Sequence, residues 1–198
     1  MESGQKSILS CISRRSLMLA APLALAAPLA LASCATTDLP PLPPTGAYRL
    51  GPGDEIRVAV FGQKQLSARY RIAADGHIAI PLLKPIDATG LTPDALAQRI
   101  AARLTRAGLL AHPAVAVEIR RYRPFYILGE VRRPGAYPFQ PGMTVLTAAS
   151  IAGGFTDRAA EQRFLVIRTR NGQPHRFSAR AESAIAPGDV IKVRERHF

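Results

Sequence analysis

Apolar residues recur along this chain in short alternating stretches, and turn-forming residues separate most of them. Within residues 55–60, Ile56, Val58 and Val60 alternate with more polar neighbours, as in a β-strand with one buried face. The hydrophobic content of 47% is too high for a disordered chain, and 17 prolines with 15 glycines fall short of a low-complexity one. Short strands therefore dominate the predicted fold, and 198 residues allow one ordinary domain or two small ones.

The N-terminus has the layout of a secretory signal. Basic residues up to Arg15 precede an apolar run over residues 16–32, which is short for a membrane-spanning helix. The run ends in Leu-Ala-Ser before Cys34, which resembles the bacterial lipobox, a signal whose cysteine sulfur receives a diacylglycerol. This resemblance implies removal of residues 1–33 and a lipid anchor on Cys34. A plain signal peptide is the alternative.

Two further details bear on where the chain goes. Ala35 stands where an Asp would mark retention in the inner membrane, so by the same resemblance the outer membrane is favoured. Arg14-Arg15 also resembles a twin-arginine export signal, with the general secretory route as the alternative.

Cleavage before Cys34 leaves 23 basic against 13 acidic residues, a net charge of +10 instead of +12. Such a charge normally implies a polyanionic partner, and export to the periplasm excludes nucleic acid from that role.

The exported part is predicted to hold a tether and two α+β blocks. The tether, residues 34–47, is rich in proline and is expected to be extended and semi-rigid. In the first block, residues 48–121, Asp75-Gly76 is a two-residue hairpin signal. The strands expected in this block cover residues 55–60, 70–74, 77–81 and 115–119.

One helix is expected in the first block. Thr92 offers a capping hydroxyl, and Pro93 suits the first helical position. Apolar residues from Leu96 to Leu104 recur at helical spacing. Gly108 can then end the helix in the left-handed conformation.

Residues 122–198 are predicted to form a small β-grasp-like sheet with one helix packed across it. The helix is expected over residues 144–152 and ends at Gly153-Gly154, and turns are expected at Pro134-Gly135 and Asn171-Gly172. The strand patterns cover residues 125–131, 137–139, 164–170, 176–178 and 190–194.

One sequence pattern occurs twice. Pro52-Gly53-Asp54 and Pro187-Gly188-Asp189 are each followed, after one residue, by Ile, a basic residue and Val. Proline and glycine make a turn, and an aspartate there can accept hydrogen bonds from backbone amides as the next strand begins. We expect a structural role for both motifs, as for the other turn residues, with ligand binding as the alternative.

The sequence offers little catalytic chemistry. Its four histidines are far apart and lack helical pair spacing, so neither a metal ion nor a cofactor is predicted. The nucleophile elbow and the phosphate-binding glycine loop are missing from the sequence. A carboxylate pair drawn from Asp75, Glu118 and Glu130 for glycoside cleavage is the enzymatic alternative. No catalytic residue is predicted.

Seven segments match one protein family in the same order along the chain. They cover residues 48–60, 74–81, 90–96, 113–117, 128–131, 133–137 and 152–156. Together they resemble the polysaccharide export proteins of capsule and exopolysaccharide secretion. The resemblance implies a polysaccharide export domain over residues 48–121, followed by a soluble-ligand-binding β-grasp (SLBB) domain over residues 122–198.

This resemblance also implies a mode of action. Such a protein forms a homo-oligomeric ring in the periplasm, anchored by its lipid to the outer membrane. The ring conducts secreted polysaccharide without covalent chemistry and docks to an inner-membrane copolymerase. Larger relatives carry a C-terminal helix that builds the outer-membrane pore, and this chain stops at Phe198 without one, so a separate outer-membrane channel is an expected partner. A monomeric sugar-binding or adaptor lipoprotein is the alternative.

Arginines are densest at the junction of the two blocks. The cluster consists of Arg120, Arg121, Arg123, Arg132 and Arg133. These side chains are the candidate contacts for an acidic polysaccharide. A solvated surface or salt bridges between subunits is the alternative.

Overall fold

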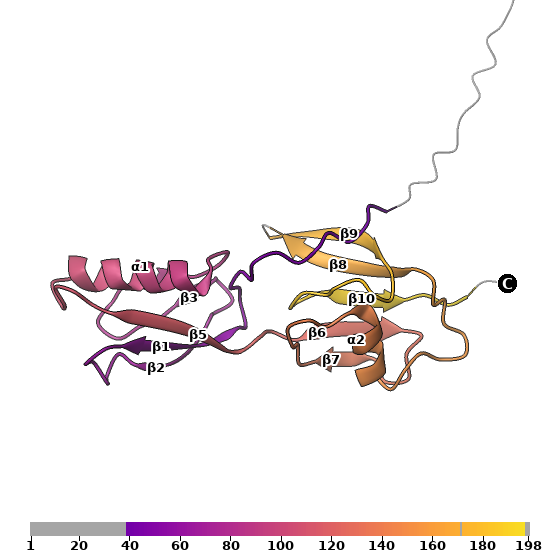
Figure 1. The fold of residues 1–198 in the computed structure, drawn as a ribbon, viewed down its shortest axis with the longest axis horizontal. Helices are drawn as coiled ribbons and strands as arrows, with labels where there is room; N and C mark the ends of the chain where they lie inside the picture. Colours follow the sequence, from indigo (N-terminus) through magenta and orange to yellow (C-terminus); the bar gives the residue numbers. More distant parts are fainter. Residues whose placement is uncertain (1–38, 171, 197–198) are drawn as a thin grey trace, which may run out of the picture. The chain divides into compact units, whose positions relative to one another are not determined.

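The computed structural model describes residues 39–170 and 172–196 (Figure 1). The expected signal peptide, the expected lipidation site at Cys34 and the first part of the tether lie outside these residues. The described part of the chain contains two helices, which lie among short strands of three sheets. The α+β class expected from the sequence is confirmed.

The first block is a three-stranded antiparallel sheet with a helix packed against it. Strands β2 (Ala68–Arg71), β1 (Glu55–Val60) and β5 (Val115–Arg121) are hydrogen-bonded in that order. Helix α1 (Pro93–Arg106) contacts β5, and its apolar face is completely buried. The largest side chains of this core are Leu50, Ile56, Ile72, Ile78, Ile86, Leu96, Ile100 and Leu104.

Helix α1 begins and ends where the sequence predicts. The hydroxyl of Thr92 accepts a hydrogen bond from the backbone N–H of Ala95, which satisfies one of the free amides of the first turn. At the other end, Gly108 has φ +68°, and its N–H donates to the carbonyl of Thr105. The N–H of Leu109 donates to the carbonyl of Leu104, completing a Schellman motif.

A turn forms at Asp75-Gly76, and the hairpin expected around it is present only at its closed end. The N–H of Gly76 donates to the carbonyl of Ala73, and the N–H of Ala73 donates to the carbonyl of His77. However, β2 pairs with β1, whereas β3 (His77–Ile78) pairs with β4 (Ile86–Asp87). The reason lies in Ile72, whose backbone exchanges hydrogen bonds with Gly53 and Asp54 and so continues the pairing towards the start of β1.

The second block is a five-stranded sheet with the strand order β7-β6-β10-β8-β9. The last strand, β10, lies at the centre, parallel to β6 and antiparallel to β8. Helix α2 (Val145–Ile151) buries Val145, Ala148 and Ala149 in the core of this block. This arrangement confirms the β-grasp-like sheet. The strands are β6 (Phe125–Gly129), β7 (Gly135–Tyr137), β8 (Phe164–Arg170), β9 (Gln173–Ala179) and β10 (Val190–Val193).

The turns of this block have the residues that their backbone requires. Helix α2 is capped by Thr144 and is followed by Gly153 and Gly154, with φ +88° and +90°. The turn expected at Pro134-Gly135 is wrong in position, because Gly135 is already the first residue of β7 and pairs with Ile127 of β6. Strands β8 and β9 pair from Arg170 and Gln173 onwards as a hairpin. Asn171 of the predicted turn lies outside the described residues.

The described part of the tether, residues 39–47, is called the strap below. It is extended, as expected, but it is not a free spacer. The N–H of Leu42 donates to the carbonyl of Ser178 in β9 at 2.8 Å, and the N–H of Ser178 donates to the carbonyl of Pro40, also at 2.8 Å. Leu42 packs against the core of the second block. The strap binds there because β9 is an edge strand with unpaired backbone groups, and its pairing covers that edge.

Candidate functional site

The two Pro-Gly-Asp motifs form closely similar turns. The side chains of Asp54 and Asp189 are both fully buried. Asp54 Oδ2 accepts a hydrogen bond from the N–H of Gly51 at 2.9 Å, and Asp189 Oδ2 accepts one from the N–H of Ala186 at 2.7 Å. In each turn the aspartate therefore binds the amide three residues before it.

Each buried aspartate also binds an arginine. Arg168 Nε donates to Asp189 Oδ1 at 2.8 Å and Arg168 Nη2 donates to Asp189 Oδ2 at 2.7 Å, so the pair is bidentate. Asp54 Oδ1 accepts from the backbone N–H of Arg123 at 2.9 Å, and Asp54 Oδ2 accepts from Arg123 Nη1 at 3.0 Å. Buried charges are tolerated when they are paired and hydrogen-bonded in this way.

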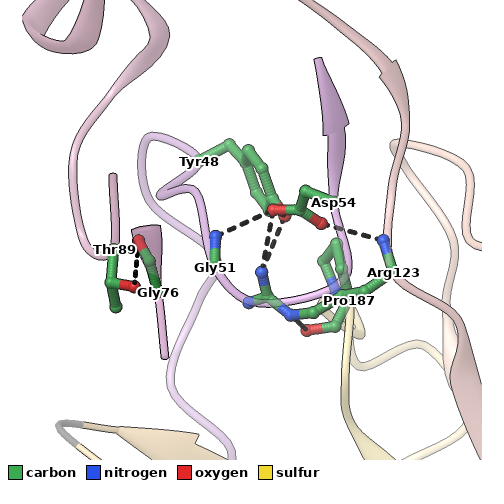
Figure 2. A network of polar contacts seen from close by, with 7 residues as sticks. All are labelled: Tyr48, Gly51, Asp54, Gly76, Thr89, Arg123 and Pro187. Carbon is green, nitrogen blue, oxygen red and sulfur yellow. Dashed lines mark hydrogen bonds and ion pairs between the residues drawn. The ribbon is translucent and has the colours of Figure 1, made fainter. Parts of the chain in front are cut away.

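Arg123 joins the two turns to each other (Figure 2). While Nη1 binds Asp54 of the first turn, Nε donates to the carbonyl of Pro187 in the second at 3.1 Å. A Cβ atom on Gly51 would lie 2.6 Å from Nη1, and one on Gly188 would lie 2.9 Å from Nε. Both glycines are therefore needed to admit the guanidinium group. Arg123 acts as an internal connection between the first and second blocks.

Tyr48 completes this network. Its hydroxyl donates to Asp54 Oδ2 at 2.5 Å and accepts from Arg123 Nη1 at 2.9 Å. Burial of the phenol, together with the hydrogen bond to Asp54, raises the pKa of Tyr48 far above its usual value. The phenol therefore stays protonated and serves as a donor to the buried carboxylate.

The arginines predicted as one cluster are divided in space. Arg120 and Arg121 end β5, and Arg121 Nε lies 3.9 Å from Glu55 Oε2. Arg132 and Arg133 come only after β6, whose five residues span about 17 Å. The Arg133 guanidinium donates to the carbonyl of Ile151 at the end of α2. The five residues of β6 thus lie between the two halves of the arginine cluster expected from the sequence, and contact of these arginines with polysaccharide stays a prediction.

Family models match both blocks. The model described as polysaccharide biosynthesis/export protein matches residues 42–120, and the SLBB domain model matches residues 124–177. The chain belongs to the polysaccharide biosynthesis/export family. It is also 33% identical, over 174 residues, to the exopolysaccharide production protein ExoF of Rhizobium meliloti. That alignment covers 82% of this chain but only 38% of the length of ExoF.

The network described above lies where the two family regions meet. Tyr48 and Asp54 belong to the polysaccharide biosynthesis/export region, Arg123 lies between the two regions, and Pro187 follows the matched part of the SLBB domain. The sequence predicted that Asp54 and Asp189 bind backbone amides, but it gave no sign of their arginine partners. Arg168 is 21 residues from Asp189 and Arg123 is 69 residues from Asp54, so no local pattern connects them.

The described residues contain neither a metal-binding cluster nor a membrane-spanning helix. Within residues 39–170 and 172–196, no three histidine, cysteine, aspartate or glutamate side chains gather as a metal site would require. Neither of the helices in this part of the chain has the length and apolar character needed to cross a membrane.

Proposed function

We propose that this chain is a lipid-anchored component of an exopolysaccharide export machine, located in the periplasm at the outer membrane. It conducts the polymer through a homo-oligomeric ring and performs no covalent chemistry. The observation that carries this proposal is the succession of an export domain and an SLBB domain in one chain. Its partners are the secreted polysaccharide, an inner-membrane copolymerase and a separate outer-membrane channel.

The internal connection between the blocks supports a mechanical role. Residues 122–124 form the linker between β5 and β6. Hydrogen bonds from Arg123 to Asp54 and Tyr48 hold this linker on the first block, and the hydrogen bond from Arg123 to Pro187 connects the same side chain to the second block. Most donors of this network are used inside the chain, as expected for a structural joint. A conduit built from many copies needs subunits that keep their form as polymer passes.

Exposed apolar residues of the first block support self-association. Phe61, which follows β1, is 88% exposed and lines an apolar hollow of about 330 Å³ with Val60 and Val115. An exposed aromatic side chain beside an apolar hollow is suited to a protein interface. We assign this surface, around Phe61, to contact with a second copy of the chain.

The exposed arginines are proposed to face the polymer. Arg120, Arg121, Arg132 and Arg133 are all exposed, whereas Arg123 is occupied by the internal network and is left out of this role. Exposed guanidinium groups hold anions weakly because water screens them. Weak, repeated contacts suit a polymer that must slide.

Deletion of the gene tests this function. We expect surface and secreted polymer to fall, and the wild-type gene to restore them. Cys34→Ser should move the protein from the membrane fraction to the soluble periplasmic fraction and reduce export. Native mass spectrometry of the detergent-solubilised protein should show a closed oligomer. Normal secretion in a strain without a second copy of the gene contradicts the proposal, and a strict monomer that binds glycan favours the adaptor alternative.

A further inference from the structure

A cavity of about 340 Å³ lies beside the strap. Its volume is within the range of small-molecule binding sites in proteins. One wall is the strap itself with Tyr48 and Arg49, and the others come from the linker before β6, the loop before α2, the end of β8 and the loop before β10. We call it the strap cavity.

Aromatic rings form one side of the strap cavity. Tyr122 packs edge-on against Tyr48, with ring centroids 4.9 Å apart, and against Phe139, with centroids 5.6 Å apart. All three residues line the cavity and are only partly buried, so part of each remains accessible. Aromatic rings offer flat apolar surfaces, which suit the C–H faces of a sugar ring. Met143 and Ile185 add further apolar lining.

The charged groups of the cavity are all of one sign. Its lining includes Arg49, Arg123, Arg168 and Arg170, and no carboxylate of the described residues. Asp54 neutralises Arg123 and Asp189 neutralises Arg168, each from outside the cavity lining. Arg49 and Arg170 have no carboxylate partner among the described residues.

These two arginines have donors to offer a ligand. Arg49 uses Nη1 to bind the carbonyl of Gly90 at 2.8 Å, and Arg170 lies with its guanidinium carbon 5.5 Å from the centre of the Phe177 ring. Neither forms an ion pair with any described residue. A guanidinium group carries five N–H donors in a fork that matches a carboxylate.

We propose that the strap cavity binds one carboxylate-bearing sugar unit of the exported polysaccharide. The aromatic side receives the sugar ring, and Arg49 and Arg170 receive its carboxylate. This inference rests on the proposed export function and adds to it a defined subsite and a preference for acidic polymers. Because both arginines are exposed, the site releases its ligand readily, as transport requires.

Isothermal titration calorimetry of the full, detergent-solubilised chain tests the subsite. The probes are trigalacturonate and a neutral galactose trimer of the same length. We expect trigalacturonate to bind and the neutral trimer to bind at least about tenfold more weakly, because it lacks the charge-assisted hydrogen bonds. Equal binding of both probes, or no binding of trigalacturonate, overturns the proposal.

Three variants locate the binding in this cavity. Arg170→Gln and the double variant Arg49→Gln/Arg170→Gln should weaken trigalacturonate binding, the double variant by about tenfold or more. Arg176→Gln removes an exposed arginine of the neighbouring strand β9 that does not line the cavity, and should change affinity by less than about twofold. Circular dichroism confirms that each variant is folded. An equal effect of all three variants would assign the binding to net charge alone and overturn the subsite.

The same variants separate this proposal from the export function. If the wild-type gene restores export to the deletion strain but trigalacturonate does not bind, the subsite is wrong and the export function stands. If the wild-type gene restores no export, the proposed function itself fails. If trigalacturonate binds through Arg49 and Arg170, we expect the double variant to lower the rate at which acidic polymer appears outside the cell.

Discussion

Removal of the Arg123 guanidinium group tests whether it is the joint between the two blocks. Arg123→Ala deletes the hydrogen bonds to Asp54 Oδ2, to the Tyr48 hydroxyl and to the carbonyl of Pro187. Asp54 keeps three donors but remains fully buried without a positive partner. Breaking a buried ion pair from one side costs about 3–5 kcal/mol. Since 27% of the Arg123 side chain is exposed, we expect about 3 kcal/mol.

Urea unfolding followed by circular dichroism measures this loss. A slope of about 2 kcal/mol per molar urea gives a midpoint lower by about 1.5 M. Arg121→Ala is the matched control, because its ion pair with Glu55 is 3.9 Å long and its side chain is 73% exposed, so it should cost less than about 1 kcal/mol. In a double-mutant cycle, Arg123→Ala with Asp54→Ala should cost at least about 1 kcal/mol less than the sum of the single changes. If the costs of Arg123→Ala and Asp54→Ala simply add, or if Arg123→Ala is as stable as Arg121→Ala, Arg123 does not join the two blocks.

Three further changes have expected outcomes. Gly129→Ala should lower the free energy of unfolding by well over the roughly 1 kcal/mol expected for Gly142→Ala. Both glycines have φ near +90°. Only at Gly129 would the new Cβ collide with backbone, since it would lie 2.0 Å from the carbonyl oxygen of Val193. Thermal unfolding compares the two, and equal losses would contradict this reasoning. Tyr48→Phe should make the free energy of unfolding less sensitive to alkali. In the wild type the pKa of Tyr48 is raised in the folded state, so the phenol of the unfolded chain ionises first and stability falls as the pH rises above about 10. Unfolding at pH 8 and at pH 11 measures the difference between the two proteins. Thr92→Ala should cost about 1 kcal/mol in urea unfolding, because the first turn of α1 loses its cap; an unchanged midpoint would show that water replaces the hydroxyl.

Local signals explain why so much of the fold could be predicted. The start of α1 depends on Thr92 and Pro93, and its end depends on Gly108, so a few neighbouring residues determine both boundaries. The strand pairing around Asp75-Gly76 could not be predicted from neighbouring residues. The partner of β3 is the two-residue strand Ile86–Asp87, which is too short to show any alternation, and hydrogen bonds to the first Pro-Gly-Asp turn decide the partner of β2.

The site shows the same contrast between local and distant contacts. The amide bonds of Asp54 and Asp189 lie within their own turns and follow from the motif. Arg123, by contrast, is one of several arginines in a basic stretch, and only its approach to Gly51 and Gly188 distinguishes it. Closeness in sequence does not by itself place Arg121 and Arg132 on one charged surface either, because the strand β6 lies between them.

The docked strap changes how far the second block can stand from a lipid attached at Cys34. Pairing with β9 begins at Pro40, only six residues after Cys34, instead of at the end of a 14-residue tether. Six extended residues reach about 20 Å at most. If Cys34 carries the proposed lipid, residue 40 can therefore lie no more than about 20 Å from the point of lipid attachment while the strap stays paired with Ser178.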